Sequence, residues 1–337
     1  IGSNTVWLYV EDYFGLVDSC QASVTVIDTI GPIINCIDTT VYLSASGSFG
    51  IDSSFVVSVL GDTCGFTTIT LSRDSFDCNG LGRNSVTVIA TDEKGDVDAC
   101  SAIVTVLDTL SPVAICQNIT LQLPISGQIG IDSSFINNGS YDNCTITRIT
   151  LSRDSFDCSD VGNNTISMTV IDGEGNSSSC IATVTIVDTV PPVPTCQNVT
   201  TYLDATGNSS IMVSQVNNSS TDNCGIDSLW LDKYNFNCSE VGLNSVSLFV
   251  RDVSGNIGVC TSTVTVIDTV SPVLSCNDTI VYLNGAGLFV IDTSYVLSSI
   301  SSGCAVSSVT LSRDTFSCND LGINQLTITA IDANGNS

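Results

Sequence analysis

The cysteines of this 337-residue chain recur with a fixed phase, and no other sequence feature restricts the fold as strongly. The sixteen cysteines are separated by 16, 28, 14 and 22 residues in a cycle that closes after 80 residues and then starts again. The segment LSRDSFDC at 71–78 returns unchanged at 151–158, at the same period. The chain is therefore a tandem array, and such an array has to be recognised before any fold is assigned.

The period also predicts the domain boundaries. We expect the C-terminal part of a repeat at 1–29, repeats at 30–109, 110–189 and 190–269, and a repeat that lacks its last strand at 270–337. We expect this sequence to be a segment of a longer array, because the next cysteine of the cycle would fall at position 340. Strand exchange between chains is an alternative explanation that needs an additional assumption.

Each repeat has the pattern of short strands separated by turn residues. In 30–109, strands are expected at 39–43, 48–52, 67–71, 84–91 and 101–108, where Val, Ile and Thr are frequent. Within the strand at 84–91, Val86, Val88 and Ala90 alternate with Thr87 and Ile89, so the first three should face a core. The sequence predicts an all-β fold of tandem immunoglobulin-like sandwiches, stapled by disulfides and forming an elongated rod.

Four cysteines per repeat fit a disulfide framework better than a zinc site, since the chain has neither a CxxC pair nor a histidine. If the first and last strands of the sandwich are parallel, Cys36 and Cys100 lie at the same pole and can pair. Cys64 and Cys78 flank a strand and its return and can close a hairpin. Four cysteines allow three connectivities, and the sequence does not choose among them. The cysteines expected to pair in this way are Cys36, Cys100, Cys64, Cys78, Cys116, Cys180, Cys144, Cys158, Cys196, Cys260, Cys224 and Cys238.

Composition excludes several classes of function. The chain has 34 acidic and 8 basic side chains and a net charge of −26, which disfavours nucleic acid and anionic lipid as partners. No apolar run approaches the roughly 20 residues needed to cross a bilayer, so no membrane insertion is expected in this segment. The serines have no candidate base beside them, and the turn Arg73–Asp74 is expected to be a solvated surface pair. We therefore expect no enzyme activity.

Acidic residues recur at three places along the repeats: the junction with the next repeat, the residue two before the second cysteine, and the turn before the last strand. The sandwich arrangement brings these places to one pole. Asn residues follow two of the positions. The candidate metal ligands are Asp28, Asp62, Asp92, Asp108, Asp142, Asn143, Asp172, Asn176, Asp188, Asp222, Asn223, Asp252, Asn256, Asp268 and Asp332.

Two interpretations of these positions stand side by side. Asp, Asn and Gly form turns in many proteins without binding anything. Three carboxylates per junction with almost no Lys or Arg to balance them instead favour Ca²⁺, which takes about six to eight oxygen ligands. Ser302 replaces the acidic residue in the last repeat, so a site is less expected there.

The segment 221–276 carries motifs that resemble the HYR-type immunoglobulin-like repeat. These motifs are the DNCG turn at 222–225, the F-x-x-x-x-x-G approach at 236–242, and the turn D-x-x-G-N at 252–256 followed by Cys260. The resemblance covers all the repeats, although GDTCGF at 61–66 and SSGCAV at 301–306 depart from the turn motif. Among repeats of this type, the chain resembles the cysteine-rich variant found in giant secreted surface proteins of gliding bacteria. The resemblance implies an extracellular, cell-surface adhesin or filament, for example a fibre that catches prey or attaches to a surface target.

Two function classes follow from this resemblance. The first is a structural and adhesive segment that assembles with copies of itself into a homo-oligomer or multi-stranded fibre. The alternative is a ligand- or glycan-binding module of a secreted protein whose enzymatic domain lies elsewhere. Aromatic residues replace Thr on one outward sheet face, which favours a docking surface. The residues expected at this interface are Trp7, Tyr9, Trp230 and Phe249.

Overall fold

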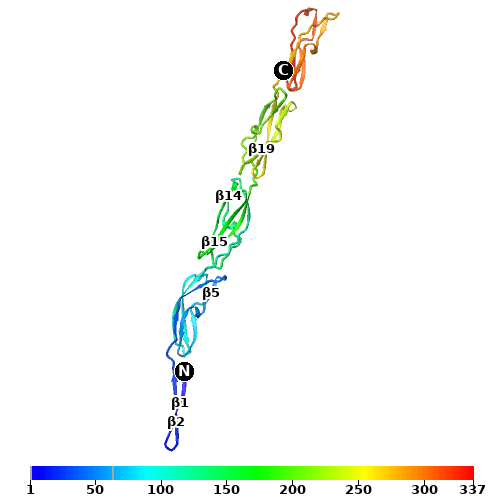
Figure 1. Cartoon of the computed structure of the whole chain (residues 1–337). Coiled ribbons are helices and arrows are strands. Elements are labelled where there is room, and N and C mark those ends of the chain that lie inside the picture. The colour runs from blue at the N-terminus through cyan, green and yellow to red at the C-terminus, as the bar shows by residue number, and fades with distance from the viewer. Residues whose placement is uncertain (1, 63) are drawn as a thin grey trace. The chain divides into compact units, whose positions relative to one another are not determined.

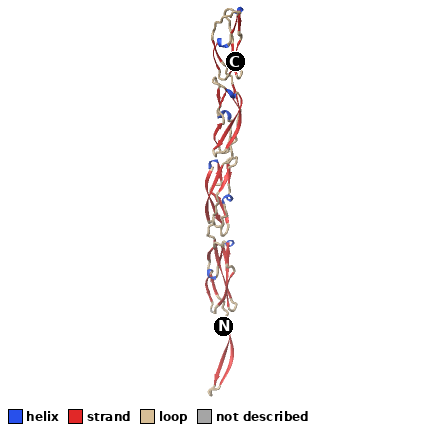
Figure 2. Cartoon of the chain, turned by 90° about the vertical axis from the view of Figure 1, so that its right-hand side faces the viewer, coloured by secondary structure: helices blue, strands red, loops and turns tan. Residues whose placement is uncertain are grey.

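The computed structural model describes residues 2–62 and 64–337, and strands dominate them (Figure 1, Figure 2). Ile1 and Thr63, which belong to the predicted segments 1–29 and 30–109, lie outside the described residues. Two compact units are distinguished. Unit 1 comprises 1–119, 131–154 and 164–184, and unit 2 comprises 120–130, 155–163 and 185–337. No helix among the described residues has the length and apolar character required to span a membrane.

Unit 1 begins with an antiparallel hairpin of β1 (Gly2–Glu11) and β2 (Val17–Val26). Apolar side chains occur on both of its faces, and Val6, Leu8 and Val10 are all at least half exposed. These three stand 80 residues before Val86, Val88 and Ala90, which are fully buried in the next repeat. The hairpin therefore has the alternating strand pattern of the last two strands of a repeat.

The repeat at 30–109 is a small sandwich. A sheet in the order β4-β10-β9-β7 faces the two-stranded sheets β3-β6 and β5-β8. The first and last strands of the larger sheet, β4 and β10, pair in parallel, as the sandwich prediction required. The elements are β3 (Ile33–Cys36), β4 (Thr39–Tyr42), β5 (Ser48–Gly50), η1 (Ser53–Phe55), β6 (Val57–Gly61), β7 (Phe66–Leu71), β8 (Ser75–Asp77), η2 (Cys78–Gly80), β9 (Gly82–Asp92) and β10 (Val97–Leu107).

The core of this repeat follows from the alternation along β9. Val86, Val88 and Ala90 are completely buried, whereas Ile89 between them is 40% exposed. Phe76 and Val56 fill the space opposite β9 and are at most 1% exposed. Complete burial of one such side chain stabilises the fold by about 1.5–3 kcal/mol. The inward and outward positions predicted from the sequence are therefore confirmed.

The segment 110–189 contributes elements to both units. Its four-stranded sheet has the order β11-β16-β15-β13, which is equivalent to the order in the preceding repeat. The elements are β11 (Ile119–Gln122), β12 (Gln128–Gly130), α1 (Ser133–Ile136), β13 (Ile146–Leu151), β14 (Ser155–Asp157), η3 (Cys158–Asp160), β15 (Gly162–Asp172) and β16 (Ser177–Val187).

Unit 2 contains the next sandwich, with the sheet order β17-β22-β21-β19, followed by a smaller core around Ile291, Val296 and Phe316. The elements of the sandwich are β17 (Val199–Tyr202), β18 (Asn208–Ser210), α2 (Val213–Val216), β19 (Ile226–Leu231), β20 (Asn235–Asn237), η4 (Cys238–Glu240), β21 (Gly242–Asp252) and β22 (Ile257–Ile267). The elements that follow it are β23 (Val273–Cys276), β24 (Leu288–Val290), η5 (Thr293–Tyr295), β25 (Leu297–Ser301), β26 (Val306–Leu311), β27 (Thr315–Ser317), η6 (Cys318–Asp320) and β28 (Ile328–Asp332).

Two kinds of disulfide alternate along the chain. The first kind joins cysteines 64 residues apart within one repeat, and it includes the predicted Cys36–Cys100 bond. The second kind joins cysteines 66 residues apart and links one repeat to the next. The disulfides are Cys36–Cys100, Cys78–Cys144, Cys116–Cys180, Cys158–Cys224, Cys196–Cys260 and Cys238–Cys304.

The predicted Cys64–Cys78 pair is wrong, and so are its equivalents 144–158 and 224–238, because Cys78 bonds to Cys144. The prediction assumed that the strand after Cys64 and its return form a hairpin. Instead, β7 pairs with β9 and β8 pairs with β5, so the chain crosses to another sheet between them. Cys78 consequently faces the following repeat.

The turn inside LSRDSFDC also differs from the prediction of a solvated pair. The Arg73 guanidinium lies 4.5 Å from the centre of the buried Phe76 ring and donates hydrogen bonds to Ser75 O and Asn84 Oδ1. Lys233 and Arg313 lie over Phe236 and Phe316 in the same way. The cationic side chain at this position covers the face of a core phenylalanine ring, which is a structural role.

Candidate metal sites at the repeat junctions

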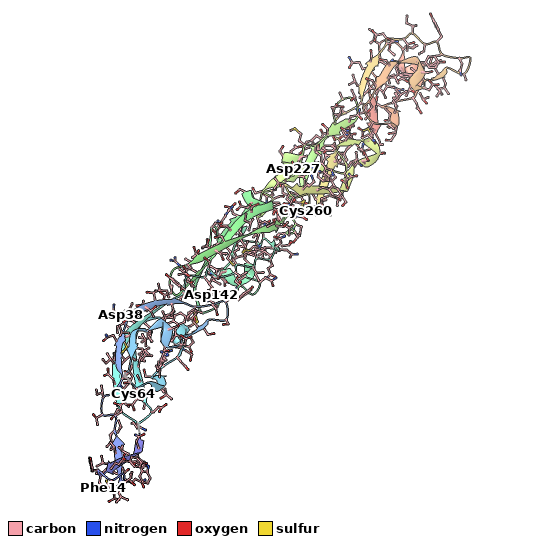
Figure 3. The ribbon with its side chains drawn as sticks, turned by 60° about the horizontal axis from the view of Figure 1, so that its bottom comes forward. Phe14, Asp38, Cys64, Asp142, Asp227 and Cys260 are labelled. Atoms are coloured by element: carbon pink, nitrogen blue, oxygen red, sulfur yellow. A yellow bond between two sulfur atoms is a disulfide. The ribbon has the colours of Figure 1, made fainter. Side chains whose placement is uncertain are left out.

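Three carboxylates from separate elements meet at one end of a sandwich in unit 1. Asp108 follows β10, Asp142 lies in the loop before β13, and Asp172 ends β15. Each offers an oxygen, and these oxygens lie within 4.8 Å of one another. We call these three residues the Asp108 cluster, and Figure 3 labels Asp142 among them. The convergence matches the grouping that the sequence predicted for this junction.

Local hydrogen bonds fix one oxygen of each turn carboxylate. Asp172 Oδ1 accepts the backbone N–H groups of Gly175 at 2.7 Å and Asn176 at 2.8 Å. Asp142 Oδ2 accepts the N–H of Cys144 at 2.9 Å. Both residues thus form turns in which the side chain bonds to the backbone a few residues on. Turn formation does not use the second oxygen of Asp142.

Two asparagine side chains connect the cluster. Asn143 Nδ2 donates to Asp108 Oδ1 at 3.1 Å. Asn176 Nδ2 donates to Asp172 Oδ2 at 2.8 Å and to the backbone carbonyl of Asp108 at 3.2 Å. The two predicted Asn ligands therefore lie beside the carboxylates and hold the end of one repeat against two loops of the next.

Buried oxygens without a partner occur in this cluster, as they do at Asp62 and Asp92 of the preceding repeat. Asp142 Oδ1 and Asn143 Oδ1 are both buried and accept no hydrogen bond. Asp108 and Asp172 are only 5% and 2% exposed. Among the described residues, no ion pair involves the three carboxylates. Burying unpaired negative charge is costly, and a bound cation is the usual compensation.

The same arrangement recurs in unit 2 as the Asp188 cluster, made of Asp188, Asp222 and Asp252. Asn223 Nδ2 donates to Asp188 Oδ1 at 3.2 Å, and Asn256 Nδ2 donates to Asp252 Oδ2 at 2.8 Å. Asp222 Oδ1 and Asn223 Oδ1 are again buried without a partner. Two separate junctions thus each have the same types of ligand at equivalent positions.

The predicted group of Asp28, Asp62 and Asp92 is not brought together as a metal-ligating cluster in the described part of the chain. The backbone N–H of Ile30 lowers the pKa of Asp28, and the Cys64 side chain and the Lys94 charge lower it further. Lys94 thus places a positive charge near Asp28. At the Asp188 cluster the equivalent position is Ser254, which carries no charge. Thr63 stands where Asn143 and Asn223 stand and lies outside the described residues.

Asp268 and Asp332 lack a third carboxylate, because Ser302 occupies the position of Asp142. Asn334 Nδ2 donates to Asp268 Oδ2 at 2.8 Å. Burial of Asp332 favours the neutral acid, but hydrogen bonds from Asn336 and the turn backbone outweigh it, so the pKa of Asp332 is lowered. The departure noted in the sequence of the last repeat therefore coincides with an incomplete set of ligands.

The chemistry of the two complete clusters fits a hard divalent cation. Carboxylate and amide oxygens suit Ca²⁺, which tolerates irregular geometry and takes about six to eight oxygens at roughly 2.3–2.6 Å. Asp108, Asp142, Asp172 and the side-chain Oδ1 of Asn143 would hold the ion in unit 1, and their equivalents would hold it in unit 2.

The aromatic residues predicted at an interface occur as two stacked pairs. Trp230 and Phe249 are direct cross-strand neighbours, with ring centres 5.4 Å apart and planes inclined by 5°. Trp7 and Tyr9 have ring centres 6.2 Å apart and are more than half exposed. Trp230 and Phe249 are half-buried, in part because each stacked ring covers the other.

Comparisons with known proteins place these repeats beside a few relatives. No family model matches the chain. Hyalin of Strongylocentrotus purpuratus is 28% identical over 299 residues, which are 83% of this chain and 25% of that protein. Hyalin of Lytechinus variegatus is 28% identical over 300 residues, which are 83% of this chain and 56% of that protein. An uncharacterized 81.3 kDa protein of Acholeplasma phage L2 is 28% identical over 206 residues. The chain spans about a quarter to a half of the length of these relatives.

Solved structures that match the chain include a protocadherin extracellular domain and a titin fragment. The protocadherin GammaB4 extracellular domain has 14% identity and a TM-score of 0.29, over 85% of this chain and 63% of that chain. An I-band fragment of titin has 12% identity and a TM-score of 0.31, over 71% of this chain and 100% of that chain. The fold assignment rests on the strand order, and the similarity to the two hyalins supports the HYR-like adhesion repeats that the sequence motifs predicted.

Proposed function

We propose that this chain is a structural and adhesive segment of an extracellular protein, in which Ca²⁺ at the repeat junctions fixes one repeat against the next. The observation that carries the proposal is the double occurrence of a three-carboxylate cluster with buried, unpartnered oxygens. In each cluster one carboxylate comes from one repeat and two come from the next. A cation shared by all three would therefore resist bending at the junction.

Two further observations support an extracellular role. The six disulfides of the described residues are typical of proteins that fold in an oxidising compartment. The sequence is also similar to two hyalins. We propose attachment to a cell surface and no enzyme activity for this segment. The bacterial origin indicated by the sequence resemblance stays a prediction.

We also propose that copies of the chain associate through the outward face that carries Trp230 and Phe249. The two stacked rings lie in one cross-strand row with Val259, which is 52% exposed. Aromatic side chains frequently anchor protein interfaces. Self-association through such a face would give the fibre that the sequence resemblance implies.

Calcium titration of the full chain tests the central proposal. Isothermal titration with CaCl₂ should show about two bound ions, one for each complete cluster. Thermal melting should give a higher Tm in CaCl₂ than in chelator, since a hundredfold excess over Kd stabilises the folded state by about 2.7 kcal/mol. MgCl₂ serves as the control, because Mg²⁺ requires near-octahedral geometry and should stabilise less. Identical melting curves in calcium and chelator would exclude the junction sites.

A further inference from the structure

The loop that carries two of the ligands in each cluster is covalently tied to the preceding repeat. Asp142 and Asn143 directly precede Cys144, which bonds to Cys78 with a Cα–Cα distance of 5.5 Å. The Cys144 N–H also donates to Asp142 Oδ2. In unit 2, Asp222 and Asn223 precede Cys224 in the same manner, and Cys224 bonds to Cys158. The cysteine is thus adjacent to the ligands in sequence and in space.

A glycine turn of the preceding repeat presses against the same loop. The Cys78 Sγ lies 3.4 Å from the Asn143 carbonyl oxygen, and Asn143 Nδ2 donates to Ser44 O at 3.4 Å. Gly47 has a φ of +71°, and a Cβ atom at this position would lie 2.3 Å from the Asn143 carbonyl oxygen. Only a residue without a side chain fits there. The loop 142–144 is therefore held between a disulfide and a glycine turn.

From these contacts we infer that the inter-repeat disulfide Cys78–Cys144 is a positioning element of the Asp108 cluster, and that Cys158–Cys224 plays this role for the Asp188 cluster. The inference rests on the proposed calcium function. Each disulfide holds the ligand loop over the carboxylate that ends the preceding repeat, so the ion binds without first having to order the loop. Groups that orient metal ligands typically change metal affinity by about 10–100-fold when they are removed.

The chain itself contains a matched control. Cys238–Cys304 has the same spacing and the same contact with a glycine turn, since a Cβ on Gly207 would lie 2.3 Å from the Gly303 carbonyl oxygen. Its loop reads Ser302–Gly303 instead of Asp–Asn, so no carboxylate or amide ligand precedes the cysteine. Loss of this disulfide should affect stability without affecting calcium binding at the two complete clusters.

The test compares calcium titrations of the full chain and of two double variants. Cys78→Ser/Cys144→Ser should keep one site of unchanged affinity and weaken the other by about 10–100-fold. Cys238→Ser/Cys304→Ser should keep both sites unchanged. Circular dichroism in chelator confirms that each variant is folded at the titration temperature. Should the first double variant fail to fold, Gly47→Ala keeps every cysteine, displaces the loop and should weaken the same site, with Gly207→Ala as its control.

The outcomes separate the two proposals. If the unmodified chain binds no calcium, the proposed function fails, and the positioning role fails with it. If the unmodified chain binds two ions and both Cys78→Ser/Cys144→Ser and Gly47→Ala retain full affinity at both sites, the positioning role alone is overturned. A lower Tm in chelator with unchanged affinity would show that the disulfide is only structural, which also overturns the inference.

Discussion

Asn143 Nδ2 donates a hydrogen bond to Asp108 Oδ1 across a distance of 3.1 Å, although 35 residues separate them in sequence. Asn223 and Asp188 repeat this relationship at 3.2 Å. In both pairs the carboxylate ends one repeat and the asparagine directly precedes the second cysteine of the next. The pair therefore marks the junctions whose set of ligands is complete, and it is missing where Gly303 replaces the asparagine.

Removal of one cluster carboxylate should abolish one calcium site. We expect Asp172→Asn to reduce the stoichiometry from about two ions to about one, because ligand charge sets calcium affinity. Asn retains the side-chain oxygen that accepts the turn N–H groups, so the fold should persist. Asp332→Asn, at the incomplete junction, is the matched control and should leave the stoichiometry unchanged. Equal calorimetric stoichiometry for Asp172→Asn and the unmodified chain would contradict the ligand role of Asp172.

The disulfide connectivity can be checked directly. A non-reducing peptide map of the denatured protein, alkylated at low pH to prevent exchange, should join the peptide containing Cys78 to that containing Cys144. The Cys36 peptide should be joined to the Cys100 peptide, which serves as the internal reference. A map in which Cys78 is joined to Cys64 would restore the hairpin pairing and remove the positioning role.

The contribution of Asp320 to the stability of the last repeat should depend on pH in the acid range. Hydrogen bonding to Arg313 lowers the pKa of Asp320 from 3.8 to about 2 in the folded state. A lowered folded-state pKa contributes stability above the unfolded pKa, and this contribution is lost progressively as pH falls from about 5 to about 1, through the folded pKa. The Tm difference between the unmodified chain and Asp320→Asn should therefore be largest above about pH 5 and disappear by about pH 1. A difference that does not change with pH would argue against the ion pair.

Substitution of one aromatic ring should separate assembly from stability. We expect Trp230→Ser to lower the free energy of unfolding by at most about 1 kcal/mol, the usual range for a cross-strand pair. Self-association, measured by analytical ultracentrifugation, should weaken. Ile280→Ser removes an 82% exposed apolar side chain that lies outside this sheet and is the control. Unchanged association in Trp230→Ser would remove this face from the interface.

The strand pattern could be predicted because burial alternates with period two, and Val86, Val88 and Ala90 obey it without exception. The grouping of Asp108, Asp142 and Asp172 could be predicted because a sandwich brings alternate loops to one end. The pairing of Cys78 could not, since a periodic sequence does not say which repeat supplies the partner. The contact of Arg73 with Phe76 was also missed, because a turn residue three positions before a core ring has no periodic signal of its own.

The disulfides that cross between repeats determine how the chain would respond to a pulling force. The closed loops 36–100, 78–144, 116–180, 158–224, 196–260 and 238–304 overlap in succession, so each residue between Cys36 and Cys304 lies in at least one of them. Under tension, the shortest covalent route between these two cysteines passes through the disulfides and only the stretches 78–100, 116–144, 158–180, 196–224 and 238–260. Even with every hydrogen bond broken, the stretched chain would therefore stay far shorter than its full contour length. An anchor built from such repeats would resist extension by covalent connectivity as well as by folding.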